Sequence, residues 1–129
     1  HISEGTSLPS GEKISEIIKK INHEQLLGII LSCVSPENFE LNLNEIKSLG
    51  IPFGFKLNAF IKTNPKPNYT GAYNNSKTGN PNEFLGQRKD LTPLKMAEIA
   101  KKFKDSGATI LGGCCETRPS HIKEFSKLV

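Results

Sequence analysis

Ala108-Thr-Ile-Leu-Gly-Gly-Cys-Cys115 is the stretch that decides the fold, because it predicts a short strand that runs into a loop with two adjacent cysteines. A helix is expected before this strand, with Thr92-Pro93 as its N-cap and first residue and Gly107 just past its end. The apolar residues of that helix recur at helical spacing, and they are Met96, Ile99, Ala100 and Phe103. The sequence therefore predicts a helix that is followed by this strand.

The same alternation extends toward the N-terminus. Residues 26–32 form a continuous apolar run without polar alternation, which is typical of a parallel strand covered on both faces, and the run ends at Cys33. A second strand is expected over residues 52–57, ending at Asn58. Apolar spacing also predicts helices over residues 10–21, with Ser10 as N-cap, over residues 36–49, and after Pro119.

The predicted order α-β-α-β-loop-α-β-α favours an α/β fold with a parallel sheet and right-handed crossovers. Three parallel strands do not close a barrel and leave both sheet edges open. The chain is thus expected to be a small open α/β unit or the trailing part of a (β/α)₈ barrel. Residues 58–91 interrupt the pattern and are typical of a lid, a binding loop or disorder, with Tyr73 as the expected contact to a site.

Composition narrows the class of protein. The 129 residues suit one domain, and 36% hydrophobic with 23% charged residues is typical of a soluble globular protein. No apolar run is long enough for a transmembrane helix, no secretory signal is visible, and the missing initiator Met suggests a piece of a longer protein. The net charge is +4, but the lysines are dispersed, which predicts a solvated surface and no nucleic-acid or membrane partner.

The chain has three cysteines, Cys33, Cys114 and Cys115. A disulfide between sequence neighbours is strained, because their Cα atoms lie only about 3.8 Å apart. An extracellular disulfide framework is therefore not expected, and a reducing, cytoplasmic location is favoured. Metal binding, reactive thiols or simple burial of small apolar side chains remain as interpretations.

Placement in the predicted sheet favours metal binding. All three cysteines and Asn58 follow strands, and the carboxyl ends of parallel strands meet at one edge of a sheet. Three thiolates suit Zn²⁺, and three protein ligands leave a fourth position for water or substrate, as in catalytic sites. The adjacent cysteines can share a metal only if the backbone leaves extended geometry, and Gly112 and Gly113 are expected to supply that conformational freedom.

Other interpretations stay open. His121 is a possible fourth ligand of a non-catalytic zinc site, although its place after Pro119 fits a polar residue in the first turn of a helix. His23 is expected to be exposed in a turn. The neighbouring thiols could instead serve a redox protein, and Gly112-Gly113 could bind a phosphate at a helix start.

Gly112-Gly-Cys-Cys-Glu-Thr-Arg-Pro-Ser-His-Ile122 closely resembles the C-terminal signature of the homocysteine S-methyltransferase family. Upstream, residues 31–36 around Cys33, the Leu57-Asn58 step and residues 5–11 resemble successive segments of the same family, in order. Two positions depart from the family pattern: Ser32 replaces an Asn, and Glu116 stands where Gly is frequent. The resemblance implies that residues 1–129 are the C-terminal part of one homocysteine-binding TIM-barrel domain, with strands six to eight.

The resemblance also implies a function. Cys33, Cys114 and Cys115 would bind Zn²⁺, which deprotonates the thiol of homocysteine so that it takes a methyl group from a small-molecule donor and becomes methionine. Asn58 would orient the substrate through its amide, and the alternative is an asparagine that only forms a turn. The first five βα units of such a barrel are missing from the sequence, so the chain is expected to be inactive alone. The identity of the methyl donor and the oligomeric state are not encoded in these residues.

Overall fold

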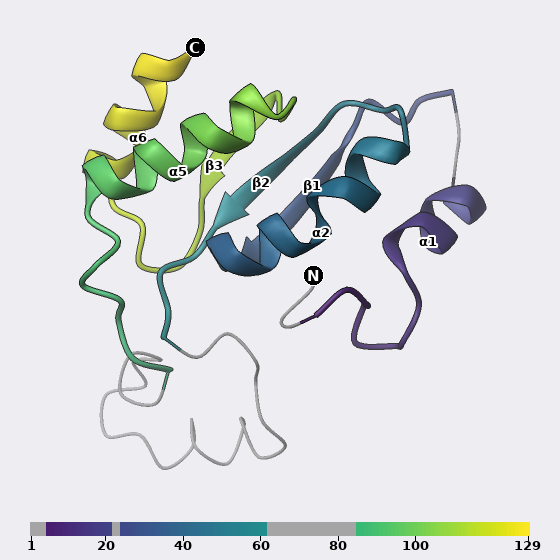
Figure 1. The fold of residues 1–129 in the computed structure, drawn as a ribbon, viewed down its shortest axis with the longest axis horizontal. Helices are drawn as coiled ribbons and strands as arrows, with labels where there is room; N and C mark the ends of the chain where they lie inside the picture. Colours follow the sequence, from purple (N-terminus) through teal and green to yellow (C-terminus); the bar gives the residue numbers. More distant parts are fainter. Residues whose placement is uncertain (1–4, 22–23, 62–84) are drawn as a thin grey trace.

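The computed structural model describes residues 5–21, 24–61 and 85–129. The expected contact residue Tyr73, most of the expected 58–91 loop and His23 lie outside the described residues. Figure 1 shows the elements, which follow one another in this order: α1 (Ile14–Ile21), β1 (Ile29–Val34), α2 (Pro36–Ser48), β2 (Phe53–Leu57), α5 (Pro93–Asp105), β3 (Ile110–Gly113), α6 (Pro119–Phe125) and a short 3₁₀ turn (Ser126–Leu128).

The three strands form one parallel sheet in the order β1-β2-β3. Each strand pairs with the next one along the chain, so β2 is central and β1 and β3 are the edges (Figure 1). This confirms the predicted open parallel α/β arrangement, and a closed barrel is not part of the described structure. Because all strands run in the same direction, their carboxyl ends lie together at one edge.

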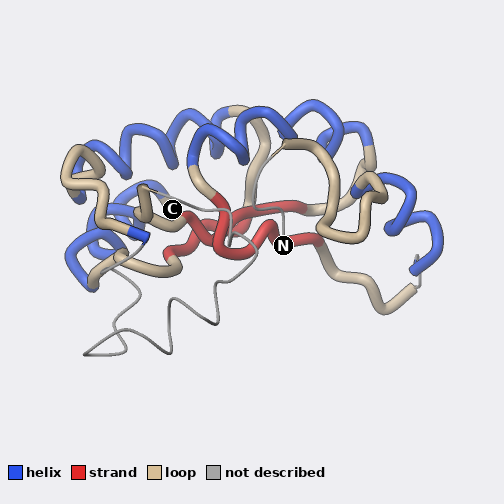
Figure 2. Tube along the Cα trace, turned by 90° about the horizontal axis from the view of Figure 1, so that it is seen from below, coloured by secondary structure: helices blue, strands red, loops and turns tan. Residues whose placement is uncertain are grey.

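The core lies between the sheet and the helices that Figure 2 shows along one side of it. Phe39 of α2, Phe55 of β2 and Phe103 of α5 pack with their ring centroids 4.7 to 5.7 Å apart. All three rings are almost completely buried. Aromatic pairs at such distances add to the free energy gained by burial. This cluster fixes α2 and α5 against the central strand.

The opposite face of the sheet differs from expectation. In a strand, successive side chains point to opposite faces, so Ile30 and Lys56 lie on the face away from Phe55. Ile30 is 43% exposed and Lys56 is also exposed. The prediction that the first strand is covered on both faces is therefore wrong for the described part of the chain, where the helices cover one face.

The first helix also begins later than expected. Ser10 is not its N-cap, because Gly11 has φ 100° and α1 starts at Ile14. The carboxylate of Glu16 instead accepts the N–H of Lys13 at 3.0 Å. The other two long helices begin as predicted, with Thr92 capping α5 and Ser35 capping α2 through their side chains.

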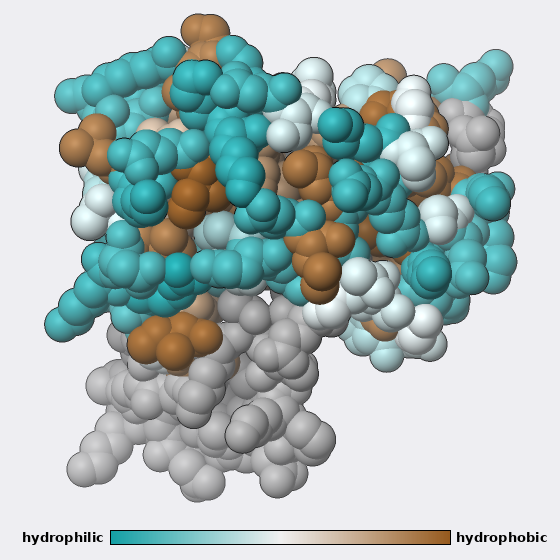
Figure 3. All heavy atoms as spheres, in the orientation of Figure 1, coloured by the Kyte–Doolittle hydropathy of each residue, from teal (hydrophilic) through white to brown (hydrophobic). Residues whose placement is uncertain are grey.

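One face of the described part of the chain is largely polar. Figure 3 shows hydrophilic residues over most of one face, with hydrophobic residues in separate groups between them. Exposed lysines of α5 pair with carboxylates, including Lys95 with Glu98 and Lys101 with Asp105. Among the described residues, no helix has the length and apolar character needed to cross a membrane.

Candidate metal centre

Cys33 lies in an irregularity near the end of β1, not after the strand as expected. Ser32 pairs with Lys56 and Val34 pairs with Leu57, so Cys33 is an extra residue without a partner on β2. Its φ of 55° places it in the left-handed region, which is uncommon for a residue other than glycine. A bulge of this kind redirects a side chain. Because of the bulge, Val34 lies on the face of the sheet that the helices cover, and the Cys33 side chain does not follow the regular alternation of the strand.

Cys114 and Cys115 directly follow β3, as predicted. The carbonyl of Cys114 accepts the N–H of Thr117 at 3.1 Å and its hydroxyl at 2.6 Å, which closes a tight turn. Glu116 has φ 62° at the third position of this turn, where a type II turn requires a positive φ. The left-handed conformation explains why glycine also suits the position of Glu116.

The glycines before the cysteines have a different role from the one expected. Gly112 and Gly113 are not among the residues with positive φ, and both pair with β2 as ordinary strand residues. A Cβ atom on Gly113 would lie 2.2 Å from the Thr117 hydroxyl oxygen. The prediction that these glycines supply unusual backbone angles is wrong; Gly113 allows the turn to fold closely over the strand.

The end of β2 holds both cysteine-bearing segments. The N–H of Cys114 donates to the Leu57 carbonyl at 2.7 Å, and the N–H of Ala59 donates to the Cys115 carbonyl at 3.0 Å. On the other side, the N–H of Asn58 donates to the Val34 carbonyl at 2.9 Å. Cysteines that are about 80 positions apart in the chain thus meet across one central segment.

The three sulfur atoms form a compact triangle. The Sγ atoms of Cys33 and Cys115 are 3.6 Å apart, those of Cys114 and Cys115 are 3.9 Å apart, and all three lie within 4.8 Å of one another. Two sulfurs each about 2.3 Å from a tetrahedral Zn²⁺ are separated by about 3.8 Å. The three thiols are free and the Cys115 side chain is exposed. The spacing and the soft donors therefore fit a zinc ion with one open coordination position.

The protonation of the cluster depends on its surroundings. Burial, together with the hydrogen bonding and charge repulsion of the neighbouring Cys114 and Cys115, raises the pKa of the Cys33 thiol to about 12. Burial also raises the pKa of Cys115. Three close thiolates repel one another, so a bound divalent cation would be needed to keep them ionised near neutral pH.

His121 is occupied elsewhere. It is buried in the first turn of α6, where its Nδ1 accepts the N–H of Arg118 at 2.9 Å. Its Nε2 therefore carries the proton and donates to the carbonyl of Leu91 at 3.1 Å. The described cluster contains no histidine. The interpretation of His121 as a polar residue at a helix start is confirmed, and the structure gives no support to a fourth ligand at this position.

Asn58 lies beside the cluster, at the end of β2, but its side chain is only 1% exposed. Its Nδ2 donates to the Cys33 carbonyl at 2.7 Å and lies 3.9 Å from the Cys33 Sγ. Its Oδ1 accepts the N–H of Phe60 at 3.2 Å. The contact of Asn58 with substrate remains a prediction, whereas its contact with the Cys33 segment is observed.

Sequence reasoning did not single out Thr117 or Ala59. Thr117 donates a hydrogen bond to the carbonyl of Cys114, and Ala59 donates one to the carbonyl of Cys115. A hydroxyl residue three positions after Cys114 was an available signal for Thr117, because such residues commonly close turns. Nothing in the side chain of Ala59 could have indicated its role, which rests on its main-chain N–H.

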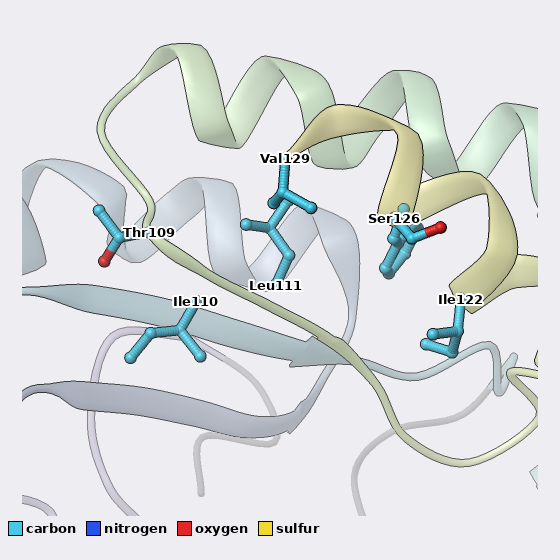
Figure 4. A pocket seen from close by; sticks show the side chains of 7 residues that line it. Thr109, Ile110, Leu111, Ile122, Ser126 and Val129 are labelled. Atoms are coloured by element: carbon cyan, nitrogen blue, oxygen red, sulfur yellow. The ribbon is translucent and has the colours of Figure 1, made fainter.

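A hollow of about 340 Å³ lies apart from the sulfur cluster. Figure 4 shows that β3 and the C-terminal helical segment border it. The lining residues are mostly apolar, and none is a cysteine: Thr109, Ile110, Leu111, Ile122, Phe125, Ser126 and Val129. The hollow is thus separate from the candidate metal centre and follows the open edge of the sheet.

A parallel α/β sheet with three free thiols gathered at its carboxyl edge defines a class of proteins with a soft-metal or reactive-thiol site. Comparison with protein families narrows this class. The model of the homocysteine S-methyltransferase family matches residues 1–129, and the chain therefore belongs to that family.

Relatives at modest identity carry the same family name. The chain is similar to proteins named homocysteine S-methyltransferase 1 from Zea mays, with 27% identity over 98% of the chain, and from Arabidopsis thaliana, with 25% identity over 96%. These matches cover 35% and 34% of the two relatives, so the chain spans about one third of their length. No solved structure matches the chain significantly.

Proposed function

We propose that this chain is the metal-binding part of a homocysteine S-methyltransferase, in which Cys33, Cys114 and Cys115 bind one Zn²⁺ and the thiol of homocysteine takes the fourth position. The observation that carries this proposal is the sulfur triangle, whose edges of 3.6 and 3.9 Å fit tetrahedral zinc. Membership of the family supports the choice of homocysteine as the thiol substrate.

Zn²⁺ bound at this site would supply the positive charge that converts a substrate thiol into a thiolate near neutral pH. The three cysteinates together carry more negative charge than the ion neutralises, so they keep a fourth sulfur electron-rich. The exposed Cys115 side leaves room for substrate to approach. The substrate thiol would release its proton to solvent and its sulfur would form a bond to the methyl carbon, while the bond between that carbon and the donor breaks and its electron pair stays with the donor, giving methionine.

We further propose that residues 1–129 are the C-terminal part of one (β/α)₈ domain, with β1 to β3 as its sixth to eighth strands. The two open sheet edges, the partly exposed face with Ile30 and Lys56 and the one-third coverage of the relatives support this assignment. The remaining strands would supply the contacts to the methyl donor, a small molecule. Free thiols fit a reducing compartment such as the cytoplasm.

The other interpretations receive less support. In a non-catalytic site with His121 as a ligand, one ring nitrogen would have to give up its hydrogen bond with the Arg118 N–H or the Leu91 carbonyl. A redox pair made of Cys114 and Cys115 leaves the approach of Cys33 to Cys115 unexplained.

X-ray absorption at the zinc edge, with and without homocysteine, tests the proposal on the zinc-loaded chain. We expect three sulfurs and one lighter atom without ligand, and four sulfurs after millimolar homocysteine is added. Homoserine, which carries a hydroxyl in place of the thiol, should leave three sulfurs and serves as the control. A metal shell that homocysteine does not change would overturn the proposal that its thiol takes the fourth position.

A further inference from the structure

The bulge at Cys33 leaves the main-chain carbonyl of Cys33 outside the ladder of the sheet. The ladder between β1 and β2 runs through Ser32 and Val34 and skips Cys33. A polar main-chain group at such a point needs another partner. The amide of Asn58 provides it, because its Nδ2 donates to the Cys33 carbonyl at 2.7 Å. This hydrogen bond closes the gap that the bulge opens.

Asn58 is itself held in one orientation. Its Oδ1 accepts the N–H of Phe60, which requires an acceptor, so the NH₂ group of the amide must face Cys33. Its own main-chain N–H donates to the Val34 carbonyl, on the far side of the bulge. The side chain is 1% exposed, so water does not compete for these bonds. Asn58 therefore contacts the bulge at two successive residues.

The same amide nitrogen also lies 3.9 Å from the Cys33 Sγ. An N–H group near a thiolate stabilises its negative charge, and groups that orient a metal ligand in this way affect metal affinity. We propose that Asn58 is a positioning residue of the metal site: its amide holds the left-handed bulge that directs the Cys33 sulfur toward Cys115, and donates weakly to that sulfur. This inference rests on the proposed function, because it assumes that the three sulfurs bind a metal.

A second buried asparagine offers a matched control. Asn42 in α2 is 0% exposed, and its Nδ2 donates to the carbonyls of Gly5 and Asn38 at 2.8 and 2.7 Å. Like Asn58, Asn42 is a buried asparagine, and it donates to two main-chain carbonyls where Asn58 donates to one. Unlike Asn58, it lies away from the sulfur cluster. Substituting Asn42 should therefore disturb folding without disturbing the metal site.

The test titrates Co²⁺ into the full chain and follows its thiolate charge-transfer and visible bands, with Zn²⁺ competition to measure zinc affinity. The variants are Asn58→Ala, Asn58→Asp and Asn42→Ala. Aspartate keeps the shape of Asn58 and can still accept from Phe60, but its carboxylate cannot donate to Cys33. We expect both Asn58 variants to lose about tenfold or more in metal affinity and to shift the visible bands, as for partners of metal ligands in general.

Asn42→Ala should bind Co²⁺ as the unaltered chain does, even if its unfolding midpoint falls. Unchanged affinity and bands in both Asn58 variants would overturn the positioning role while leaving the proposed function in place. An equal loss in Asn42→Ala would also overturn it, because fold stability would then account for the effect. Failure of the unaltered chain to bind Co²⁺ through its thiols would instead refute the proposed metal site itself.

Discussion

At the scale of single residues, the candidate site depends on two backbone positions outside the usual region. Cys33 at φ 55° and Glu116 at φ 62° each turn the chain beside a sulfur. Non-glycine residues in this conformation cost of the order of 1 kcal/mol or more, and such positions concentrate at functional sites. The surrounding hydrogen bonds from Asn58 and Thr117 offset this cost.

The protonation of Cys33 leads to a first prediction. A thiol with a pKa of about 12 is about one part in ten thousand thiolate at pH 8, so it reacts slowly with alkylating reagents. In the metal-free chain, Cys33 should therefore react at least about tenfold more slowly with iodoacetamide at pH 8 than in the urea-unfolded chain. Peptide mass spectrometry over time measures this rate. Equal rates in the folded and unfolded chains would contradict the prediction.

The close packing at Gly113 leads to a second prediction. An added Cβ atom would lie 2.2 Å from the Thr117 hydroxyl oxygen and 2.8 Å from its Cβ, so Gly113→Ala must displace the turn that carries Cys114 and Cys115. We expect about 2 kcal/mol or more of lost stability, as for other overpacked positions, and weaker zinc binding.

Gly112→Ala is the matched control for this change. Its Cβ would meet its nearest atoms, Cγ of Lys56 and the Phe55 carbonyl oxygen, at 3.3 Å, which the flexible lysine can partly accommodate. Urea unfolding and zinc competition of the two variants should therefore show the larger loss for Gly113→Ala. A smaller loss for Gly113→Ala than for Gly112→Ala would contradict the role assigned to this glycine.

At the scale of elements, the sequence was a good guide to which segments meet and a poor guide to how they meet. The strand-end positions of Asn58, Cys114 and Cys115 follow from periodicity, because parallel strands present their carboxyl ends together. The bulge at Cys33 does not follow, because it arises from the pairing of Val34 with Leu57, a contact between distant residues. The role of Gly113 was predicted wrongly for a related reason: the side chain of Thr117 leaves no room for a Cβ atom there, and this contact is not visible in the local pattern.

An ion-pair cluster connects two elements near the site. The Arg88 guanidinium donates to both carboxylate oxygens of Glu37 in α2, at 2.7 and 2.8 Å, and to Asp90 at 2.7 and 3.2 Å. The main-chain N–H of Arg88 also donates to the carbonyl of Ala59. The cluster thus joins the start of α2 to the segment that follows β2.

This cluster leads to a third prediction. Arg88→Met should lower the free energy of unfolding by about 1 kcal/mol, because a bidentate arginine network contributes more to stability than a single exposed ion pair does. Lys102→Met, which removes an exposed pair with Glu40, should cost less than about 0.5 kcal/mol. Urea denaturation of both variants makes the comparison. A larger loss of stability in Lys102→Met than in Arg88→Met would show that the Arg88 guanidinium does not stabilise the contact with α2.

At the scale of the whole molecule, the sheet has two open edges and one largely uncovered face in the described structure. Parallel sheets are normally covered on both faces, so the exposure of this face in the described part of the chain is unusual. Local sequence pattern indicated the parallel order correctly. It could not indicate the exposure of the second face, because the burial of a sheet face depends on packing between distant elements.

The open sheet leads to a fourth prediction. The 129-residue chain alone should not form methionine from homocysteine with S-methylmethionine, betaine or methylfolate as donor, although it should bind zinc. The described part provides three strands and the thiol cluster, whereas we propose that the remaining strands of the barrel supply the contacts to the methyl donor. Chromatographic detection of methionine checks this, and sustained turnover by the isolated chain would contradict it.

Zinc stoichiometry tests whether the three cysteines together form one zinc site. The chain is dialysed against a zinc buffer, and its metal content is measured for the unaltered form and for Cys33→Ser, Cys114→Ser and Cys115→Ser. We expect one zinc per unaltered chain and a marked loss in each of the three variants, because each removes one thiolate ligand. Retention of a full equivalent of zinc by any one of the three variants, or no zinc in the unaltered chain, would contradict this expectation.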